Sequence, residues 1–473
     1  MTSFSLTFVS FVFCLVSATT APADDRKGVQ APTTNDRKGV QAPTTDDGAP
    51  AKQAGGVQAI SKPNIIFIMA DDLGYGDISC YGSKTIQTPH IDKLASTGVK
   101  CTDYHSNGAV CSPTRAALMT GRYQQRSGVP GVITARAHRH TGLPLVEWTM
   151  GEAMKDLGYQ TAMFGKWHLG YAPKFNPTKQ GFDEFKGFVS GNVDYQNHID
   201  QEGHFDWWQQ DKLKDDPGYI TDLINNYAID FIRRKKDQPF LLVVNHGAPH
   251  YPIQGRKTPG FRVTGKSNRQ QPKLKTDNPT ALYKEMIEVM DEGIGNIVTE
   301  LEKQGIRNNT LIIFTSDNGP AKIGSAGTFR GHKGQVYEGG HRVAGVFNWT
   351  AQLPPGETCA TPILSMDMLP TFVSISGGKI DPSRKLDGIN VLPALKGTPI
   401  KRKPLFWQFK GNTAVRDGSW KLVLTGKKTE LFNLEKDLSE QNNLADKHPD
   451  HVTRLTKLIK AWQSSVAASS EGK

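Results

Sequence analysis

Short apolar runs alternate with helical patterns through most of the chain. A continuous apolar run of five to seven residues is typical of a strand that is buried on both faces, as in a parallel sheet. Strands that alternate with amphipathic helices favour an α/β fold with a mostly parallel sheet flanked by helices. The apolar runs cover Asn64–Ala70, 160–164, 240–244 and 311–315, and the helical patterns cover 145–157, 219–234 and 281–304.

Each apolar run stops at a cluster of polar residues. Ligands of α/β folds bind outside the carboxyl ends of the strands, so we expect these clusters to converge on one site. A surface loop explains any single cluster equally well, but it does not explain four of them. Carboxylate and amide oxygens without a nearby thiolate favour Ca²⁺ or Mg²⁺ over Zn²⁺. The oxygen donors at these strand ends are Asp71, Asp72, Asp317 and Asn318.

The last quarter of the chain changes pattern. An apparent helix start at 367–372 is followed by linkers rich in Gly and Pro, and then by short alternating runs. Asp417-Gly418 between two of these runs is a hairpin signal. We therefore predict a small C-terminal antiparallel sheet with a helix packed on it. The strand-like runs cover 404–408, 413–416, 420–424 and 430–433, and the amphipathic helix covers 451–462.

The N-terminus has no pattern of a packed domain. Residues 4–18 are apolar and are followed by small residues, which is typical of a secretory signal over 1–21, although no Lys or Arg precedes the run. The segment 22–60 repeats D-R-K-G-V-Q-A-P-T-T and is expected to be a disordered spacer. We predict a catalytic domain over 61–375 and a C-terminal subdomain over 376–473. We expect the protein to be secreted or periplasmic and to have no membrane span.

The formal charge narrows the choice of partners. Lys and Arg number 57 against 46 Asp and Glu, a net +11, and residues 1–60 hold five of each sign. The excess therefore lies in the folded part, where it can attract nucleic acid, anionic membranes or acidic polysaccharides. No basic run has interleaved aromatic residues, so we expect no nucleic-acid partner.

The most informative segment runs from Cys111 to Arg122 and reads C-S-P-T-R-A-A-L-M-T-G-R. Pro113 suits the first turn of a helix, so Cys111 would lie at a helix N-terminus, where backbone N–H groups attract anions. Arg115 lies one turn further on the same face. C-x-P-x-R followed by T-G-R resembles the signature of type I, formylglycine-dependent sulfatases of the alkaline phosphatase superfamily. Five further motifs agree in family order: A-D-D-L-G-Y-G-D from Ala70, G-K-W-H-L-G from Gly165, A-P-H-Y-P from Ala248, S-D-N-G from Ser316 and H-K-G-Q-V-Y-E-G-G-H-R-V from His332.

The resemblance implies a modified nucleophile. Cys111 would be oxidised to formylglycine by a formylglycine-generating or anaerobic sulfatase-maturing enzyme. One hydroxyl of the hydrated aldehyde would attack sulfur and expel the alcohol, and the other would then release sulfate as the aldehyde re-forms. The implied Ca²⁺ ligands are Asp71, Asp72, Cys111 as formylglycine, Asp317 and Asn318.

The same resemblance assigns the remaining catalytic roles. Arg115 would orient the hydrated aldehyde, and Lys166 and Lys333 would hold sulfate and the leaving oxygen. His168 would be the base that triggers sulfate release. His250 would be the general acid for the alcohol, with His246 as a competing candidate.

Of the other cysteines, Cys80 and Cys101 are a candidate disulfide pair.

Substrate recognition is expected to come from loops. The segment 191–198, with Trp207 and Trp208 nearby, offers polar groups beside aromatic rings, as a sugar needs. The loop and the overall pattern resemble those of sulfatases that act on galactose or N-acetylgalactosamine sulfate, so we expect O-sulfated units of this type in a polysaccharide. An ordinary packed loop is the competing interpretation. The candidate substrate-binding residues are Asn192, Asp194, Tyr195 and His198, with Arg330 and His332 as a second location.

Two other functions compete with the sulfatase interpretation. A phosphomonoesterase or phosphonate hydrolase of the same superfamily usually has a Ser or Thr nucleophile and two zinc ions, whereas this chain has Cys111. A catalytically silent, glycan-binding homologue would be expected to have lost part of the site. Cys111, the Asp set and both lysines are all present.

Overall fold

The computed structural model describes residues 62–470. The predicted signal peptide (1–21) and spacer (22–60) lie outside these residues.

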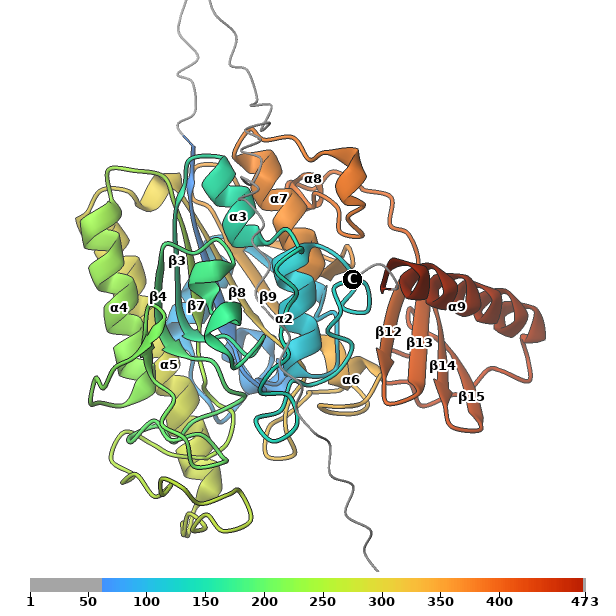
Figure 1. Ribbon diagram of the computed structural model, residues 1–473. Helices are drawn as coiled ribbons and strands as arrows, with labels where there is room; N and C mark the ends of the chain where they lie inside the picture. The colour runs from blue at the N-terminus through green and yellow to red at the C-terminus, as the bar shows by residue number, and fades with distance from the viewer. Residues whose placement is uncertain (1–61, 471–473) are drawn as a thin grey trace, which may run out of the picture. The chain divides into compact units, whose positions relative to one another are not determined.

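A mixed sheet of eleven strands forms the centre of the described chain (Figure 1). Five neighbouring strands, β8-β1-β7-β3-β4, pair in parallel, while β9 is antiparallel to both β8 and β2. The path is β10-β2-β9-β8-β1-β7-β3-β4-β5-β6, and β11 pairs with β2. The strands are β1 (Asn64–Ala70), β2 (Val99–His105), β3 (Gln160–Lys166), β4 (Glu184–Phe188), β5 (Trp208–Gln209), β6 (Lys212–Leu213), β7 (Phe240–Asn245), β8 (Thr310–Ser316), β9 (Arg342–Asn348), β10 (Glu357–Cys359) and β11 (Ile363–Leu364).

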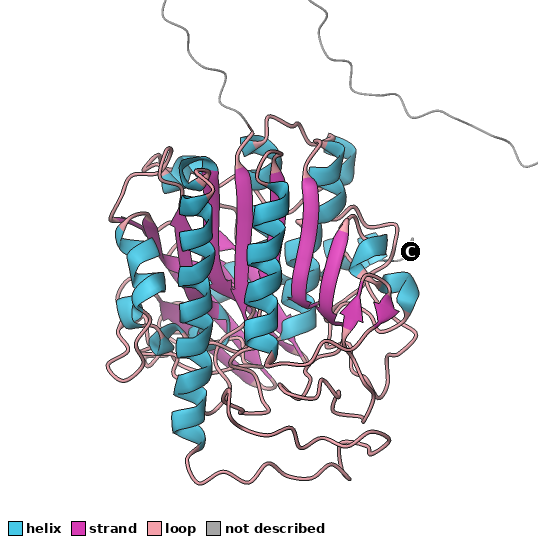
Figure 2. Cartoon of the chain, turned by 90° about the vertical axis from the view of Figure 1, so that its left-hand side faces the viewer, coloured by secondary structure: helices cyan, strands magenta, loops and turns pink. Residues whose placement is uncertain are grey.

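Both faces of this sheet are covered, which explains the unbroken apolar runs. Ile65, Phe67 and Met69 of β1 pack into one core, and Ile66 and Ile68 pack into the other. The first core includes residues of α2 (Cys111–Thr120), α3 (Met150–Asp156) and α7 (Met368–Ile375). The second includes residues of α1 (Pro89–Ser96), α4 (Ile220–Lys235) and α5 (Pro279–Lys303), and Figure 2 looks onto this face.

Helix boundaries follow capping chemistry more closely than hydrophobic periodicity. The predicted helix at 145–157 begins only at Met150, because Thr149 and Glu152 form a capping box. Leu145 and Val146 are 52% and 74% exposed and take no part in it. By contrast, α5 begins at Pro279, just after the Asn278 cap and two residues before the predicted start.

A four-stranded antiparallel sheet follows, as predicted. Its strands are β12 (Leu405–Phe409), β13 (Asn412–Asp417), β14 (Trp420–Thr425) and β15 (Lys428–Asn433). Asp417 pairs with Trp420, so the predicted hairpin turns at Gly418. The helix α9 (Pro449–Ser470) packs on this sheet through Leu455, Ile459 and Trp462. Two short helices, α6 (Glu338–His341) and α8 (Leu392–Leu395), lie in the connections. Within 62–470, no helix has the length and apolar character needed to cross a membrane.

Candidate active site

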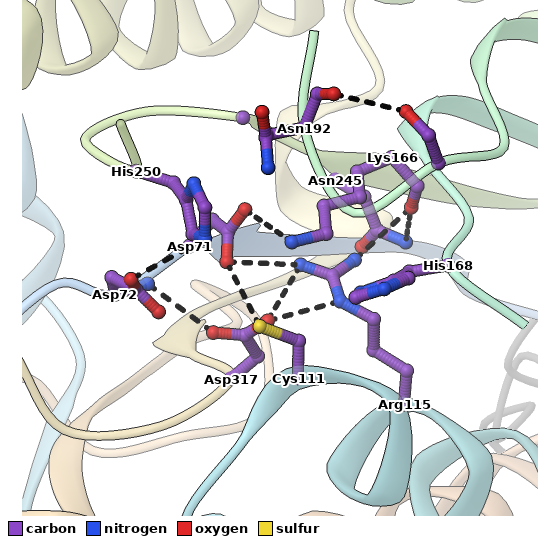
Figure 3. Close-up of polar contacts among 12 residues, drawn as sticks. Asp71, Asp72, Cys111, Arg115, Lys166, His168, Asn192, Asn245, His250 and Asp317 are labelled. Carbon is purple, nitrogen blue, oxygen red and sulfur yellow. Dashed lines mark hydrogen bonds and ion pairs between the residues drawn. The ribbon is translucent and has the colours of Figure 1, made fainter. Parts of the chain in front are cut away.

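The polar clusters predicted at the strand ends meet at one place. Figure 3 shows their side chains pointing toward one another above the N-terminus of α2. They come from the carboxyl ends of parallel strands, so they share one edge of the sheet. Asp71 and Asp72 follow β1, Lys166 ends β3, His250 follows β7, Asp317 and Asn318 follow β8, and Cys111 opens α2.

Asp71 and Asp317 face cations that are themselves buried. Lys166 Nζ lies 2.5 Å from Asp71 Oδ2, and both side chains are inaccessible to solvent. Arg115 Nε donates to Asp317 Oδ2 at 3.0 Å, Nη2 lies 2.8 Å from the same oxygen in an ion pair, and Nη1 donates to the Lys166 carbonyl. Burial raises the pKa of Asp71 to about 7, although Lys166 opposes this shift. For Asp317, burial is outweighed by Arg115 and Lys166, and its pKa is lowered.

Asp72 lies on the other side of the cluster. Lys333 Nζ is 2.6 Å from Asp72 Oδ1, and Asn318 Nδ2 donates to the same oxygen at 2.8 Å. His250 Nε2 lies 3.6 Å from Asp72 Oδ2. Burial favours the neutral acid, but His250 and Lys333 outweigh it and lower the pKa of Asp72. Asp72 is therefore an anion at neutral pH.

These residues fit a hard divalent cation. Asp71, Asp72, Cys111 and His250 each offer a ligand atom within 4.8 Å of one another. Asn318 Oδ1 is buried without a hydrogen-bond partner in the described structure, which leaves a lone-pair donor for a ligand. Carboxylate and amide oxygens are the donors that Ca²⁺ and Mg²⁺ prefer.

Cys111 is the first residue of α2 and is 2% exposed. Its Sγ lies 3.6 Å from Asp71 Oδ1. Burial raises the pKa of the Cys111 thiol to about 12, even though Lys166 and Lys333 act in the opposite direction. An unmodified thiol at this position stays protonated and is a weak nucleophile.

Two of the three candidate histidines face the site. His168 has φ 58°, and its Nε2 lies 2.9 Å from the Ile133 carbonyl, while Nδ1 has no partner in the described structure. His250 faces Asp72 through Nε2, and its Nδ1 lies 2.7 Å from the Tyr251 carbonyl. His246 is fully buried, and neither ring nitrogen contacts a described residue by hydrogen bonding. The geometry thus favours His250 over His246 as the residue near a leaving group.

Comparison with known proteins identifies the family. The family model for sulfatases matches residues 63–378. The chain belongs to the sulfatase family. N-acetylgalactosamine-6-sulfatase of Rattus norvegicus is 32% identical over 392 residues, covering 76% of this chain and 71% of that protein. Arylsulfatase A of Homo sapiens is 32% identical over 403 residues, covering 78% and 76%. The structure of Ps i-CgsB in complex with k-i-k-neocarrahexaose has TM-score 0.78 and 31% identity, covering 85% of this chain and 93% of that one.

This sulfatase is therefore a sulfuric ester hydrolase with the alkaline phosphatase-like fold of its structural relatives. The predictions of family and fold are confirmed. The cluster around Cys111 brings this cysteine together with the carboxylates, lysines and His250 of the family motifs.

The predicted sugar-reading role of Asp194, Tyr195 and His198 needs correction. Asp194 is inaccessible to solvent, and its two oxygens accept hydrogen bonds from four backbone N–H groups and from Gln254. The Tyr195 hydroxyl donates to the Gly247 and His250 carbonyls. His198 stacks on Trp207 and contacts the Gly218 carbonyl. These polar groups shape the loop from within and are not presented to a ligand.

The other substrate-binding candidates divide. Asn192 is 7% exposed and stands above Lys166 in Figure 3, so it borders the site. Arg330 instead joins the small sheet: its Nη1 contacts Glu430 and the Glu440 carbonyl, and its guanidinium lies over the Tyr337 ring. The His332 ring is half-buried, with Nδ1 3.0 Å from the Lys333 carbonyl.

Sequence reasoning missed three residues of the site. Asn245 Nδ2 donates to the Lys166 carbonyl at 3.0 Å and so supports that lysine. Arg262 is buried and binds the Asn192 side chain. Tyr251 is 47% exposed, stacks on the His250 ring at 4.8 Å, and donates from its hydroxyl to Gln201. Tyr251 stood within the A-P-H-Y-P motif, and Asn245 directly follows the apolar run 240–244, so both positions carried a usable signal; Arg262 carried none.

The candidate Cys80–Cys101 disulfide is not present. Cys80, Cys101 and Cys359 are free thiols. Cys101 on β2 is the register partner of Cys359 on β10, so its neighbouring thiol is Cys359 and not Cys80. The pairing of β10 with β2 places Cys359 next to Cys101, and the spacing of the cysteines in the sequence does not predict this pairing.

Proposed function

We propose that this sulfatase removes sulfate from O-sulfated galactose or N-acetylgalactosamine units of a polysaccharide, using formylglycine derived from Cys111 and Ca²⁺. The observation that carries the proposal is the environment of Cys111. It is buried among three carboxylates and three cations, with a thiol pKa of about 12. A thiol in that state is a poor catalyst, and an oxidised residue 111 accounts for a site built around it.

Two groups absent from the amino-acid sequence would supply part of the chemistry. Formylglycine, hydrated, would provide the nucleophilic oxygen, and Ca²⁺ held by Asp71, Asp72, Asp317 and Asn318 would neutralise sulfate charge. The unpartnered Oδ1 of Asn318 supports this ligand set.

The chain's own cations would bind and orient the sulfate. Lys166 and Lys333 are held 2.5 and 2.6 Å from Asp71 and Asp72, so their ammonium groups are fixed in position before substrate binds. Fixed charges of this kind stabilise the charge that develops during sulfate transfer. Arg115, anchored to Asp317, would orient residue 111 from one turn further along α2.

The two histidines would move protons. Burial lowers the pKa of His250 to about 3, so the ring is neutral at pH 7 until a negative ligand favours its protonation. A bound sulfate ester is such a ligand, and His250 would then protonate the departing alkoxide. His168 is kept neutral by burial and by Lys166 and Arg115, as a base requires, and its unpartnered Nδ1 can accept a proton.

The carbohydrate substrate is supported by the relatives and by one exposed ring. One relative is named for N-acetylgalactosamine-6-sulfate, and another was solved with k-i-k-neocarrahexaose. Tyr251 offers a partly exposed aromatic face beside His250, where a leaving sugar would lie. Its partner Gln201 also contacts Asn192, so polar groups border that face. We also propose that the chain is secreted or periplasmic and is matured by an enzyme that oxidises Cys111.

The test is desulfation of defined O-sulfated galactose and N-acetylgalactosamine oligosaccharides, with sulfate measured by ion chromatography. The tryptic peptide that contains residue 111 is analysed by mass in the same sample. We expect sulfate release together with a formylglycine mass. Release of phosphate from phosphomonoesters without any release of sulfate, or full activity with an unmodified Cys111, would refute the proposal.

A further inference from the structure

The loop 253–278 differs in charge from the rest of the sulfatase. It contains seven Lys and Arg residues and one Asp, a formal +6 in a chain whose total is +11. Together with 246–252 it makes a connection of 33 residues between β7 and α5 without a helix or strand. Connections of this length inside a folded domain are uncommon, and they are usually either functional or linker segments.

Five of the seven cations point into solvent. Arg256 is paired with Asp222 and Glu292, and Arg262 is buried against the site loop. None of the other five makes an ion pair with a carboxylate of residues 62–470. They are Lys257, Lys266, Arg269, Lys273 and Lys275, and all five are exposed.

The loop is attached directly to the wall of the active site. Phe261 and Arg262 donate their backbone N–H groups to Asp194, and the Arg262 side chain reaches Asn192. Asn192 follows Gly191, where an added Cβ would lie 2.9 Å from His168 Nε2. The basic loop is thus two contacts away from a catalytic side chain.

A second attachment fixes the middle of the loop. Gly265 N donates to the Gly203 carbonyl at 2.9 Å, and Asn268 N donates to Glu202 at 3.4 Å. These contacts hold Lys266 and Arg269 beside the turn at 200–204, which also contributes Gln201 to the rim near Tyr251. In Figure 1 the loop, yellow-green, extends from the lower end of α5, the end at which the site lies.

We propose that the basic loop 253–278 is a binding surface for a polysulfated polysaccharide chain, which holds sulfate groups other than the one being hydrolysed. This inference rests on the proposed function and extends it: the preferred substrate is a polyanion, not an isolated sulfated sugar. Several unpaired cations on one flank of an anion pocket raise the local concentration of a polyanion and its rate of arrival. The same attraction weakens at high ionic strength, because exposed charges are screened over about 10 Å at 0.1 M salt.

The test separates binding from turnover. All proteins carry Cys111→Ala, which removes hydrolysis. The loop variant carries K266Q, R269Q, K273Q and K275Q in addition. The matched control neutralises Lys93, Lys236, Lys303 and Lys379, which are also exposed. Lys236 and Lys303 precede β7 and β8, at the opposite end of the sheet from the site. The probe is a sulfated galactan, compared with its chemically desulfated form, at 50 mM and 500 mM NaCl.

We expect the loop variant to bind the sulfated galactan about tenfold or more weakly at 50 mM NaCl, with the difference nearly gone at 500 mM. The control variant should differ from the parent by less than about twofold. Equal losses in both variants, or no loss in the loop variant, would overturn the inference. So would loop-dependent binding to duplex DNA or anionic phospholipid vesicles that matches the galactan in affinity. Because no turnover is measured, an enzyme that failed to desulfate sugars would refute only the proposed function.

Discussion

Substitution of Asp194 tests whether this side chain stabilises its own loop or contacts the sugar substrate. Its carboxylate accepts five hydrogen bonds: from the backbone N–H groups of Gln196, Asn197, Phe261 and Arg262, and from the Gln254 side chain. Two of these donors, on Gln254 and Arg262, are buried. At about 1–3 kcal/mol for each buried donor left unsatisfied, Asp194→Ala should lower the free energy of unfolding by about 2–6 kcal/mol.

The companion substitution Asp194→Asn tests the same geometry more finely. Asn keeps one acceptor oxygen but turns an NH₂ group toward backbone donors on either Phe261 and Arg262 or Gln196 and Asn197. We therefore expect a loss of stability comparable to that of the Ala variant. Asp215→Ala is a suitable control, since Asp215 is exposed and nearby in the chain, and it should change the free energy of unfolding by less than about 0.5 kcal/mol.

Urea unfolding followed by tryptophan fluorescence gives the stability, and activity is measured on an aryl sulfate and on a sulfated oligosaccharide. Because Asp194 shapes the loop that carries Asn192, both activities should fall together. A variant of normal stability that loses activity only on the oligosaccharide would show that Asp194 contacts the sugar directly, and the reasoning from its hydrogen bonds would be wrong.

Three further predictions concern the catalytic centre. Cys111→Ala should abolish turnover while circular dichroism stays unchanged, because the side chain is small and opens a helix; near-normal rates would exclude residue 111 as the nucleophile. His250→Ala should slow sugar sulfates about 10²–10⁴-fold more than activated aryl sulfates, which leave without protonation. Equal losses in a kinetic comparison would move the acid role to Lys333. Chelation should remove activity and Ca²⁺ should restore it; recovery with Zn²⁺ alone, assayed in metal-stripped buffer, would contradict the oxygen ligand set.

Much of the fold was predictable because the central strands are buried on both faces. Such strands read as unbroken apolar runs, and β1, β7 and β8 were found to within two residues. The strand β2 was missed because it carries polar residues inward. Asp103 on β2 is buried between Arg342 and Arg416, so a strand that belongs to the sheet has the composition of a loop.

The site divides in the same way. The side chains of Asp71, Asp72, Lys166, Asp317 and Asn318 stand at the ends of buried strands, where strand order alone brings them together. Cys111 and Arg115 on α2, and Lys333 in a loop, were grouped with them only through the family motifs. Asp194 and Asn192 lie in a loop whose amide and carboxylate groups can serve either a sugar or the loop's own backbone. Which of the two they serve depends on whether residues 254–262 pack against this loop, and no local sequence pattern predicts that contact.

Two residues of the site have a backbone conformation that is unusual for their residue type. Asp72 and His168 have φ of 63° and 58°. Gly adopts this left-handed conformation without an energetic cost, whereas residues with a Cβ atom adopt it at a cost. Each follows a buried strand, and each is held by its surroundings: Asp72 by Lys333 and Asn318, and His168 by the Ile133 carbonyl. A glycine at either position would relax the backbone and remove a carboxylate or an imidazole from the centre of the site. Side chains kept at such positions indicate that chemistry, and not the stability of the turn, determines the residue.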